Sequence, residues 1–258
     1  MKNNIITLDC LETYPKKLLD YLATLNPQEE FPEVDHNMVE YLKSFNTYIY
    51  HCTKLKNKDD ILNRGIKRIA FSQQIKNEYI SLLKEISYDN YDFEKWINEY
   101  NYLPGRGTTI HTAGTLSYIK EDQWCLDFFK YFGGEILIEI IKDNLHKIIK
   151  NDEEVKNKVN KYREKLSEIG SPYLVRLLVP IKELDCFSDY RYFFGQMCRF
   201  YKNYSSKFKG HYIPNIGIVY HRDILPSEIN HIFNVRINDK ISNSNETNYI
   251  SIYWFLIE

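Results

Sequence analysis

The sequence lacks closely spaced cysteines, and this disfavours the sites that cysteine usually builds. The 258 residues contain five cysteines: Cys10, Cys52, Cys125, Cys186 and Cys198. No two are close enough for a CxxC motif, and an odd number cannot pair completely. A cysteine-based zinc site and a disulfide framework are therefore both disfavoured, and we predict no metal site. This cysteine usage favours the interior of a cell, so we expect a cytoplasmic protein.

Long hydrophobic runs are also missing. No apolar stretch approaches the roughly 18 residues that a membrane-spanning helix requires. Residues 1–22 lack the basic segment and long apolar core of a signal peptide. We therefore expect no membrane partner. The net charge of −1 gives no general attraction to nucleic acid or to a lipid surface.

Several common catalytic motifs are absent as well. The sequence contains neither the GxxxxGK[ST] phosphate loop nor the GxGxxG dinucleotide-binding turn. The GxSxG nucleophile elbow and the HExxH zinc motif are likewise absent. Nucleotide binding by a phosphate loop or a Rossmann turn is therefore not supported.

The composition that remains is that of a globular protein. Hydrophobic residues make up 43% of the chain and charged residues 27%, which is enough apolar surface for a core. The length fits one large domain, or one domain with a helical appendage. The 22 tyrosines carry an apolar ring and a polar tip, so we expect many of them at half-buried positions.

Hydrophobic periodicity predicts an α+β fold. Helices are expected within 11–45, where prolines interrupt the pattern, and at 59–64, 73–100, 118–131, 143–168, 190–204 and 225–233. Strands are expected at 46–51, 66–71, within 102–114, and at 135–141, 173–181, 213–224 and 248–258. We divide the chain into a helical N-terminal region, 1–45, and one domain, 46–258, with helical insertions near 73–100 and 143–168.

The stretch YIYHCTKLKNKDDILNRGIKRI, residues 48–69, contains the first functional signal. A strand leads into His51 and Thr53, and a short helix then ends at Gly65. We predict that Gly65 is the residue after this helix, in a left-handed conformation. Three further elements follow in order: TIHTAG, YFGGEILIEI and GIVYHRDILPSEINHI.

This order of elements resembles the ADP-ribosyltransferase superfamily, whose members include bacterial toxin and defence types and PARP-like and RNA 2′-phosphotransferase-like proteins. The resemblance covers roughly residues 46 to 232 and implies a split mixed or antiparallel sheet. It also implies that the protein uses NAD as a substrate. The matching residues are His51 and Thr53, Ile61 to Ile66, His111 and Thr112, and Ile224 to Ile229.

The resemblance implies a role for His51, whose side chain would donate to a ribose hydroxyl of NAD. Thr53 would support the pocket, and Gly65 would let the chain turn sharply beside the bound NAD. Each position also has a simpler interpretation. His51 could be a histidine satisfied by local partners, and Thr53 could cap the helix that follows.

Residues of the loop and strand that follow could complete the pocket. Arg106 lies between two glycines, where a guanidinium can clamp a pyrophosphate in forked geometry. His111 and Thr112 would line the nicotinamide side. The alternatives are a surface arginine and an ordinary pair of strand residues.

The catalytic carboxylate is the open position. ADP-ribosyl transfer passes through an oxocarbenium-like ribose, which a nearby carboxylate stabilises. Glu135 begins a predicted buried strand and is our candidate, although it could simply cap that strand. Many members carry this glutamate on the late strand, where the present sequence offers only His221 and Asp223. Three alternatives stay open: Glu246 could be the acid, His221 could take a changed role, or the protein could bind without catalysis.

The resemblance implies ADP-ribosyl transfer to a macromolecular target, either protein or nucleic acid. Bacterial relatives of this type are often toxins or anti-phage effectors, so an antitoxin or another defence-system partner is expected. The alternatives are a catalytically inactive module that binds nucleic acid or a protein, and a purely structural interaction protein. The strip RFYKNYSSKFKGH, residues 199–211, is typical of a surface that faces nucleic acid, or else of a solvated helix end.

Overall fold

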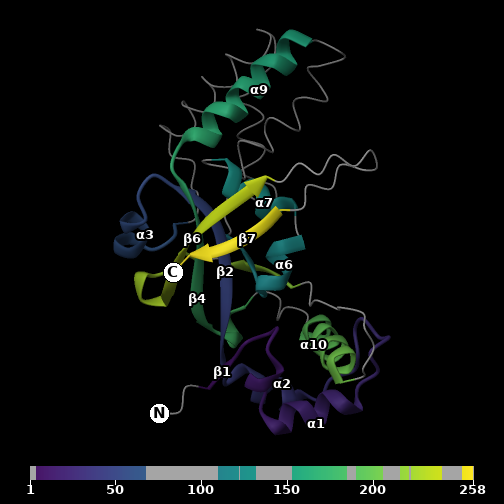
Figure 1. Ribbon diagram of the computed structural model, residues 1–258. Helices are drawn as coiled ribbons and strands as arrows, with labels where there is room; N and C mark the ends of the chain where they lie inside the picture. The colour runs from purple at the N-terminus through teal and green to yellow at the C-terminus, as the bar shows by residue number, and fades with distance from the viewer. Residues whose placement is uncertain are drawn as a thin grey trace, which may run out of the picture.

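The computed structural model describes residues 4–67, 110–121, 123–131, 153–184, 190–205, 216–220, 222–239 and 252–257. These residues form an α+β fold built on one sheet (Figure 1). Hydrophobic clusters lie on both faces of the sheet. Within the described segments, every helix is too short or too polar to cross a membrane.

The sheet is antiparallel apart from a two-residue strand that pairs with one of its inner strands. The order of its six main strands is β5-β3-β2-β4-β6-β7, and every neighbouring pair is antiparallel. The short strand β1 pairs with β2 in parallel. The strands are β1 (Ile5–Ile6), β2 (Asn46–Leu55), β3 (Ile110–Ala113), β4 (Ser171–Pro180), β5 (Gly217–Tyr220), β6 (Ile229–Asp239) and β7 (Ile252–Ile257).

The helices begin and end largely where local sequence signals place them. Pro15 precedes α1, and Asp35 caps α2 by accepting a hydrogen bond from the backbone N–H of Asn37 at 2.9 Å. The α-helices are α1 (Lys16–Thr24), α2 (His36–Lys43), α3 (Asp59–Arg64), α6 (Leu116–Glu121), α7 (Gln123–Lys130), α9 (Glu153–Glu168) and α10 (Tyr190–Ser205). The described residues also include the short 3-10 helices η1 (Leu11–Thr13), η2 (Ile181–Glu183) and η4 (Pro226–Glu228).

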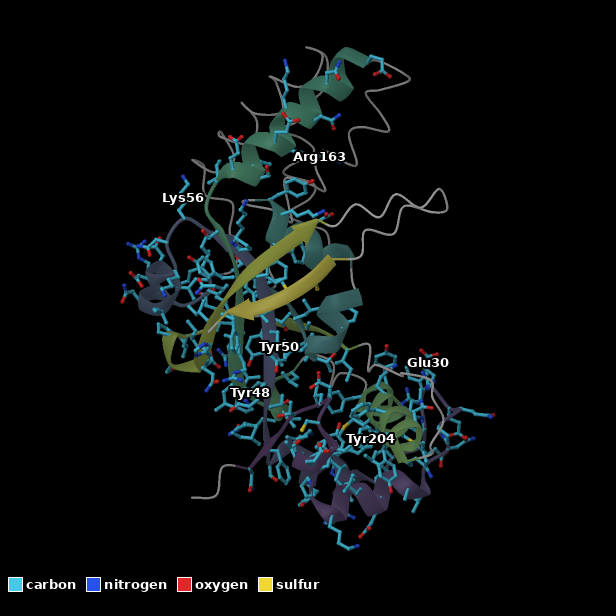
Figure 2. The ribbon with its side chains drawn as sticks, in the orientation of Figure 1. Glu30, Tyr48, Tyr50, Lys56, Arg163 and Tyr204 are labelled. Atoms are coloured by element: carbon cyan, nitrogen blue, oxygen red, sulfur yellow. The ribbon has the colours of Figure 1, made fainter. Side chains whose placement is uncertain are left out.

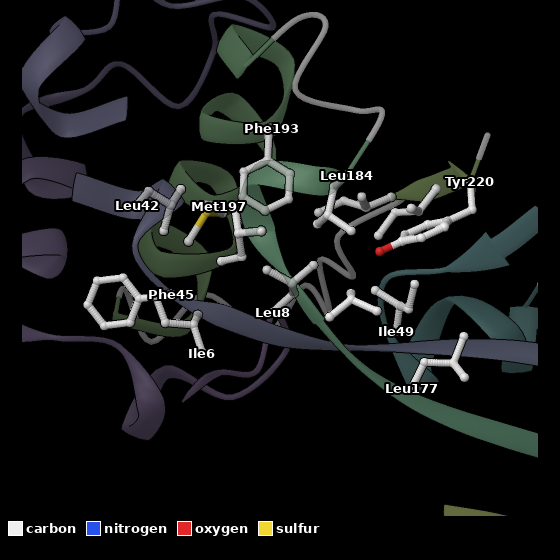
Figure 3. Packing of buried hydrophobic residues seen from close by; sticks show 14 of the residues in the cluster. Ile6, Leu8, Leu42, Phe45, Ile49, Leu177, Leu184, Phe193, Met197 and Tyr220 are labelled. Carbon is white, nitrogen blue, oxygen red and sulfur yellow. The ribbon is translucent and has the colours of Figure 1, made fainter. Parts of the chain in front are cut away.

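The larger core lies between the sheet and helices α1, α2 and α10 (Figure 3). Leu42 from α2 and Met197 from α10 are buried together with Ile49 of β2 and Leu177 of β4. The predicted division at residue 45 coincides with the start of β2, but residues on both sides of it share this core. Helices α6 and α7 cover the opposite face, where they bury residues such as Phe129 against the sheet.

The strand predicted at 46–51 is longer than the sequence indicated. β2 runs from Asn46 to Leu55 and pairs with β4 along its whole length. The length of β2 is set by its pairing with β4. The polar residues at the end of β2 interrupt the hydrophobic pattern, so the sequence alone did not indicate that they belong to the strand. The predicted helix at 118–131 corresponds to α6 with α7, and that at 143–168 corresponds to α9 from Glu153 onward, while 143–152 lie outside the described residues. The predicted helix 73–100, the predicted strand 135–141 and all of 66–71 beyond Lys67 lie outside the described residues.

The helix predicted at 225–233 is wrong beyond Glu228, because β6 begins at Ile229. A β-bulge explains the misleading pattern. Arg176 of β4 pairs with His231 and Leu177 pairs with Ile229, which leaves Asn230 as the extra residue. Ile229 and Ile232 therefore pack against the same core although they are three positions apart. That spacing is helical in the sequence but is produced by a bulge in the sheet.

Lys54 connects two helices to the sheet. Its side chain is buried, with 8% of the residue exposed. The ammonium donates to the backbone carbonyl of Lys130 at the end of α7, at 3.1 Å, and to that of Ser167 in the last turn of α9. The carbonyl ends of helices carry partial negative charge and attract a cation. Burial lowers the pKa of Lys54.

We expect Lys54→Met to destabilise the fold. Methionine keeps an apolar stem but leaves both carbonyls without their donor, which should cost about 1–3 kcal/mol of unfolding free energy. Urea denaturation measures the change. Lys58→Met, at an exposed lysine before α3, is the matched control and should cost little. Equal stability of the Lys54 and Lys58 variants would contradict this role.

Candidate functional site

His51 and Thr53 lie on the same face of β2. They alternate with Tyr50 and Cys52, which pack under α6 and α7 on the other face. Both are half-buried. The sequence had indicated that the strand ends at these residues, but β2 continues to Leu55. Thr53 is therefore a strand residue with a register partner on β4, and not the cap of α3.

Further polar residues adjoin His51 and Thr53 on this face of the sheet. Thr53 pairs with Tyr173 of β4, which in turn pairs with Asn234 of β6. Residues in direct register share one face, so these three side chains project to the side of His51. We call His51, Thr53, Tyr173 and Asn234 the polar patch. Sequence reasoning missed Tyr173 and Asn234, which only strand pairing across the sheet brings to this position.

The patch has a sharp apolar boundary. His51 pairs with Val175 of β4, and Val175 pairs with Ile232 of β6. Val175 is fully buried, as is Ile49, two residues before His51. The polar patch therefore begins where the larger hydrophobic core ends, so its polar groups lie beside buried apolar side chains.

Thr112 lies next to His51 across the β2–β3 pairing. Tyr50 pairs with Ala113, so the positions after Tyr50 and before Ala113 are neighbours in an antiparallel arrangement. Thr112 is buried, and its hydroxyl donates to the backbone carbonyl of Ile218 at 3.0 Å. The hydroxyl proton thus forms a hydrogen bond between β3 and β5. A ligand could therefore only donate a hydrogen bond to this oxygen. The backbone of His111 is in register with Val219, and its side chain lies outside the described residues.

The two isoleucine motifs of the sequence meet in the structure. The backbone N–H of Ile66 donates to the carbonyl of Ile224 at 3.0 Å, and that of Ile224 donates to the carbonyl of Ile66 at 2.9 Å. We call this pair of hydrogen bonds the motif bridge. Ile61 and Ile229, the outer residues of the two motifs, contribute to the same hydrophobic cluster. The isoleucine spacing of both motifs is thus explained by one shared core.

Gly65 makes the motif bridge sterically possible. Its φ is 71° and its ψ is −167°, a region that only glycine normally occupies. The prediction of a positive φ is confirmed, but the ψ differs from that of the left-handed helical region. A Cβ at this position would lie 2.0 Å from the carbonyl oxygen of Ile224. Glycine is therefore required both by the backbone angle and by the close approach of Ile224.

Arg222, which sequence reasoning also missed, closes the turn that carries Ile224. Its Nη1 and Nη2 donate to Oε2 and Oε1 of Glu228 at 2.8 and 2.6 Å, and Nη2 also donates to Glu183. The guanidinium lies 4.9 Å from the ring centroid of Tyr220. The signal in the sequence was an arginine and a glutamate on either side of a proline turn, in RDILPSE.

The charges of this turn stabilise one another. The hydrogen bonds to Glu228 are the main cause that raises the pKa of Arg222. Burial alone would raise the pKa of Glu228, but hydrogen bonds from Arg222 and from the backbone N–H of Leu225 hold it below its usual range. Asp223 forms an ion pair with Lys67 at 3.2 Å, beside the motif bridge.

Four candidate residues, Arg106, Glu135, His221 and Glu246, lie outside the described residues. In the part of the chain that the structure describes, no cluster of three or more histidine, cysteine, aspartate and glutamate side chains could hold a metal ion. The structure therefore places His51 and Thr53 on one face of β2 and Thr112 on the neighbouring strand β3, and it joins Gly65 to the late motif.

The basic strip at 199–211 is partly structural. Nε of Arg199 donates to the carbonyl of Pro27 at 3.1 Å, and Nζ of Lys202 donates to the carbonyl of Ala23 in α1. These two cations hold α10 against the N-terminal helices. Tyr204 is 65% exposed at the end of α10 (Figure 2). Lys207 and Lys209 lie outside the described residues.

Comparisons of the chain with protein-family models, with curated proteins and with solved structures gave no match. The case for a function therefore depends on the polar patch, the motif bridge and the order of the sequence motifs.

Proposed function

We propose that the protein transfers ADP-ribose from NAD to a macromolecular target, on a split sheet of ADP-ribosyltransferase type. The observation that carries the proposal is the motif bridge. The segments Ile61–Ile66 and Ile224–Ile229 both suggested the resemblance although they lie far apart in the sequence, and they meet in the backbone hydrogen bonds between Ile66 and Ile224, beside Gly65. This contact supports the proposal because it brings the early and the late motif of the resemblance into one structural unit.

The polar patch supports the same proposal. A dinucleotide needs hydrogen-bond donors and acceptors beside an apolar wall, and pockets of this composition are typical ligand sites. His51 and Thr53 offer an imidazole and a hydroxyl next to buried Val175. In the proposed complex His51 donates to a ribose hydroxyl of NAD. Tyr173 and Asn234 extend the polar surface away from the core.

The proposed reaction is a substitution at the ribose carbon that carries nicotinamide. The bond between this carbon and the nicotinamide nitrogen breaks, and its electron pair leaves with nicotinamide. A nucleophile of the target forms the new bond and loses its proton. Positive charge develops on the ribose between these events, and a fixed carboxylate stabilises it. Glu135 is our candidate for that carboxylate.

We expect Glu135→Gln to lower transfer by about 100-fold or more, as removal of a transition-state charge stabiliser typically does. Incorporation of labelled ADP-ribose from NAD into a cell lysate measures the rate, and the melting temperature checks the fold. Glu246→Gln is the matched control. Full activity of the Glu135 variant with loss in the Glu246 variant would move the acid to the C-terminal segment.

The labelled product also identifies the class of target. Label that a protease releases indicates a protein, and label that a nuclease releases indicates nucleic acid. We propose that the protein acts in the bacterial cytoplasm as a toxin or anti-phage effector, paired with an antitoxin or another defence-system partner. Induced expression should then arrest growth, and His51→Ala should relieve the arrest. NAD binding without label or growth arrest would favour the catalytically inactive binding module.

A further inference from the structure

We propose that Arg222 is a positioning residue, which holds the motif bridge closed and thereby keeps the face of His51 competent to bind NAD. This inference rests on the proposed function for its effect on NAD. The effect of Arg222 on the motif bridge does not depend on that function, because it follows from the hydrogen bonds of Arg222, Glu228 and Ile224 alone.

Arg222 is fixed from several directions at once. The fork to Glu228 makes two short hydrogen bonds, at 2.8 and 2.6 Å. Nη1 also donates to the carbonyl of Asp223 at 2.9 Å, and Nη2 donates to Glu183 of η2. The face of the guanidinium lies over the buried ring of Tyr220, the last residue of β5. The guanidinium therefore ties together β5, η2 and η4.

Ile224 lies inside the loop that this fork closes. Arg222 and Glu228 are six residues apart, and Glu228 also accepts a hydrogen bond from the backbone N–H of Leu225 at 2.8 Å. The carbonyl of Ile224, which accepts from Ile66 and lies against Gly65, thus belongs to a turn held from both ends. With the fork removed, the backbone around Ile224 would lose the side-chain contacts that close the turn, and the hydrogen bond from Leu225 to Glu228 would remain without its anchor on Arg222.

The exposure of these side chains indicates that Arg222 fixes the geometry of the turn and adds little to the free energy of unfolding of the whole protein. The side chains of Arg222 and Glu183 are 41% and 36% exposed, whereas that of Glu228 is 12% exposed. Exposed ion pairs contribute little to global stability. A forked arginine nevertheless imposes a planar, two-point geometry that lysine cannot reproduce. Arg222 is thus suited to set the shape of one turn without dominating the stability of the protein.

The motif bridge connects this turn to the polar patch. Ile66 follows α3, and α3 follows β2, the strand that carries His51 and Thr53. Ile61, Ile66 and Ile224 belong to the cluster that includes Ile49 and Val175, the residues that border His51. When the motif bridge opens, α3 loses its anchor on this cluster, and the rim of the patch is no longer fixed.

The test compares Arg222→Ala, Arg222→Lys and the exchanged pair Arg222→Glu with Glu228→Arg. We expect amide hydrogen exchange in peptides 60–67 and 222–228 to accelerate by about tenfold or more in the alanine variant, because local opening sets this rate. The KM for NAD should rise about tenfold while kcat changes less than about twofold, because bound NAD selects the closed bridge. The exchanged pair should recover part of both effects, and lysine should recover less than the pair.

Arg176→Ala is the matched control. Arg176 also makes a hydrogen bond, to Asn230 at 2.8 Å, and stacks on Tyr48, but it lies on the opposite face of the sheet. It should lower stability while leaving exchange in the two peptides and the KM for NAD unchanged. Equal effects in the Arg176 and Arg222 variants would reduce Arg222 to general stabilisation and overturn the proposal.

Two further outcomes are decisive. Unchanged exchange in Arg222→Ala would overturn the proposal, and so would faster exchange with an unchanged KM for NAD. If wild-type protein fails to bind NAD, the proposed function is refuted. The exchange measurement would still show whether Arg222 holds the motif bridge: faster exchange would support that part of the inference, and unchanged exchange would overturn it.

Discussion

His51→Ala is expected to remove detectable NAD binding from a protein that stays folded. His51 is half-buried on the polar patch, next to buried Val175 and close to Thr112 of β3. Truncating a half-exposed strand residue should change the unfolding free energy by no more than about 1 kcal/mol. The imidazole that we propose as the donor to the ribose would be lost completely. Calorimetric titration of NAD into wild type and variant measures the effect.

His231→Ala is the matched control, because it removes a second histidine from the same sheet. His231 pairs with Arg176, and its ring packs 4.3 Å from the ring centroid of Phe233, on the face opposite His51. Its removal should leave NAD affinity unchanged. Equal affinity of wild type and the His51 variant would exclude His51 from the site.

Gly65→Ala should have the largest effect on stability. The alanine would occupy a backbone region that costs about 1–3 kcal/mol for a residue with a side chain. Its Cβ would also lie 2.0 Å from the carbonyl oxygen of Ile224, which is backbone and cannot rotate away. We therefore expect a loss of at least about 2 kcal/mol, together with an open motif bridge. Chemical denaturation and hydrogen exchange at Ile66 and Ile224 measure the two effects.

Gly217→Ala provides the control for a glycine that needs no special geometry. Gly217 lies in β5, and a Cβ there would meet no heavy atom within 4 Å. Alanine should change the free energy of unfolding there by no more than about 1 kcal/mol, because its main effect is to reduce the conformational entropy of the unfolded chain. A Gly65 variant as stable as the Gly217 variant would show that the turn tolerates other conformations.

Local signals in the sequence were sufficient for the short helix α3 and for Gly65. The helix was predicted at 59–64 and is observed at Asp59–Arg64, because its boundaries depend on nearby residues. The positive φ of Gly65 followed from a glycine directly after that helix. Helix α10 was likewise predicted within one residue of its observed end at Ser205. In each case the information lies within a few positions of the residue concerned.

Features that depend on distant pairing were not predictable. The last residues of β2 include Lys54, whose burial depends on carbonyls of α7 and α9 far along the chain. The bulge at Asn230 gave β6 the spacing of a helix, so the wrong element was expected there. No local pattern distinguishes this spacing from that of a true helix.

Some residues of the candidate site were likewise predictable from the local sequence, and others were not. His51 and Thr53 were recognised because they follow a hydrophobic run in the sequence. Tyr173 and Asn234 join them only through the register of three strands. The pair Arg222 and Glu228 had a local signal in RDILPSE that was overlooked, whereas the second partner of Arg222, Glu183, lies on another element, before α10. A ranking of single residues by their neighbours in the sequence cannot recover such contacts.

Release of nicotinamide from NAD by purified protein, in the presence of cell lysate as a source of targets, tests the proposed chemistry most directly. We predict release by the wild-type protein in step with the labelling of lysate macromolecules by ADP-ribose. His51→Ala should release none above background, and His231→Ala should match the wild type. No release by wild type above the His51 variant, with NAD left intact, would contradict the proposed NAD-dependent transfer.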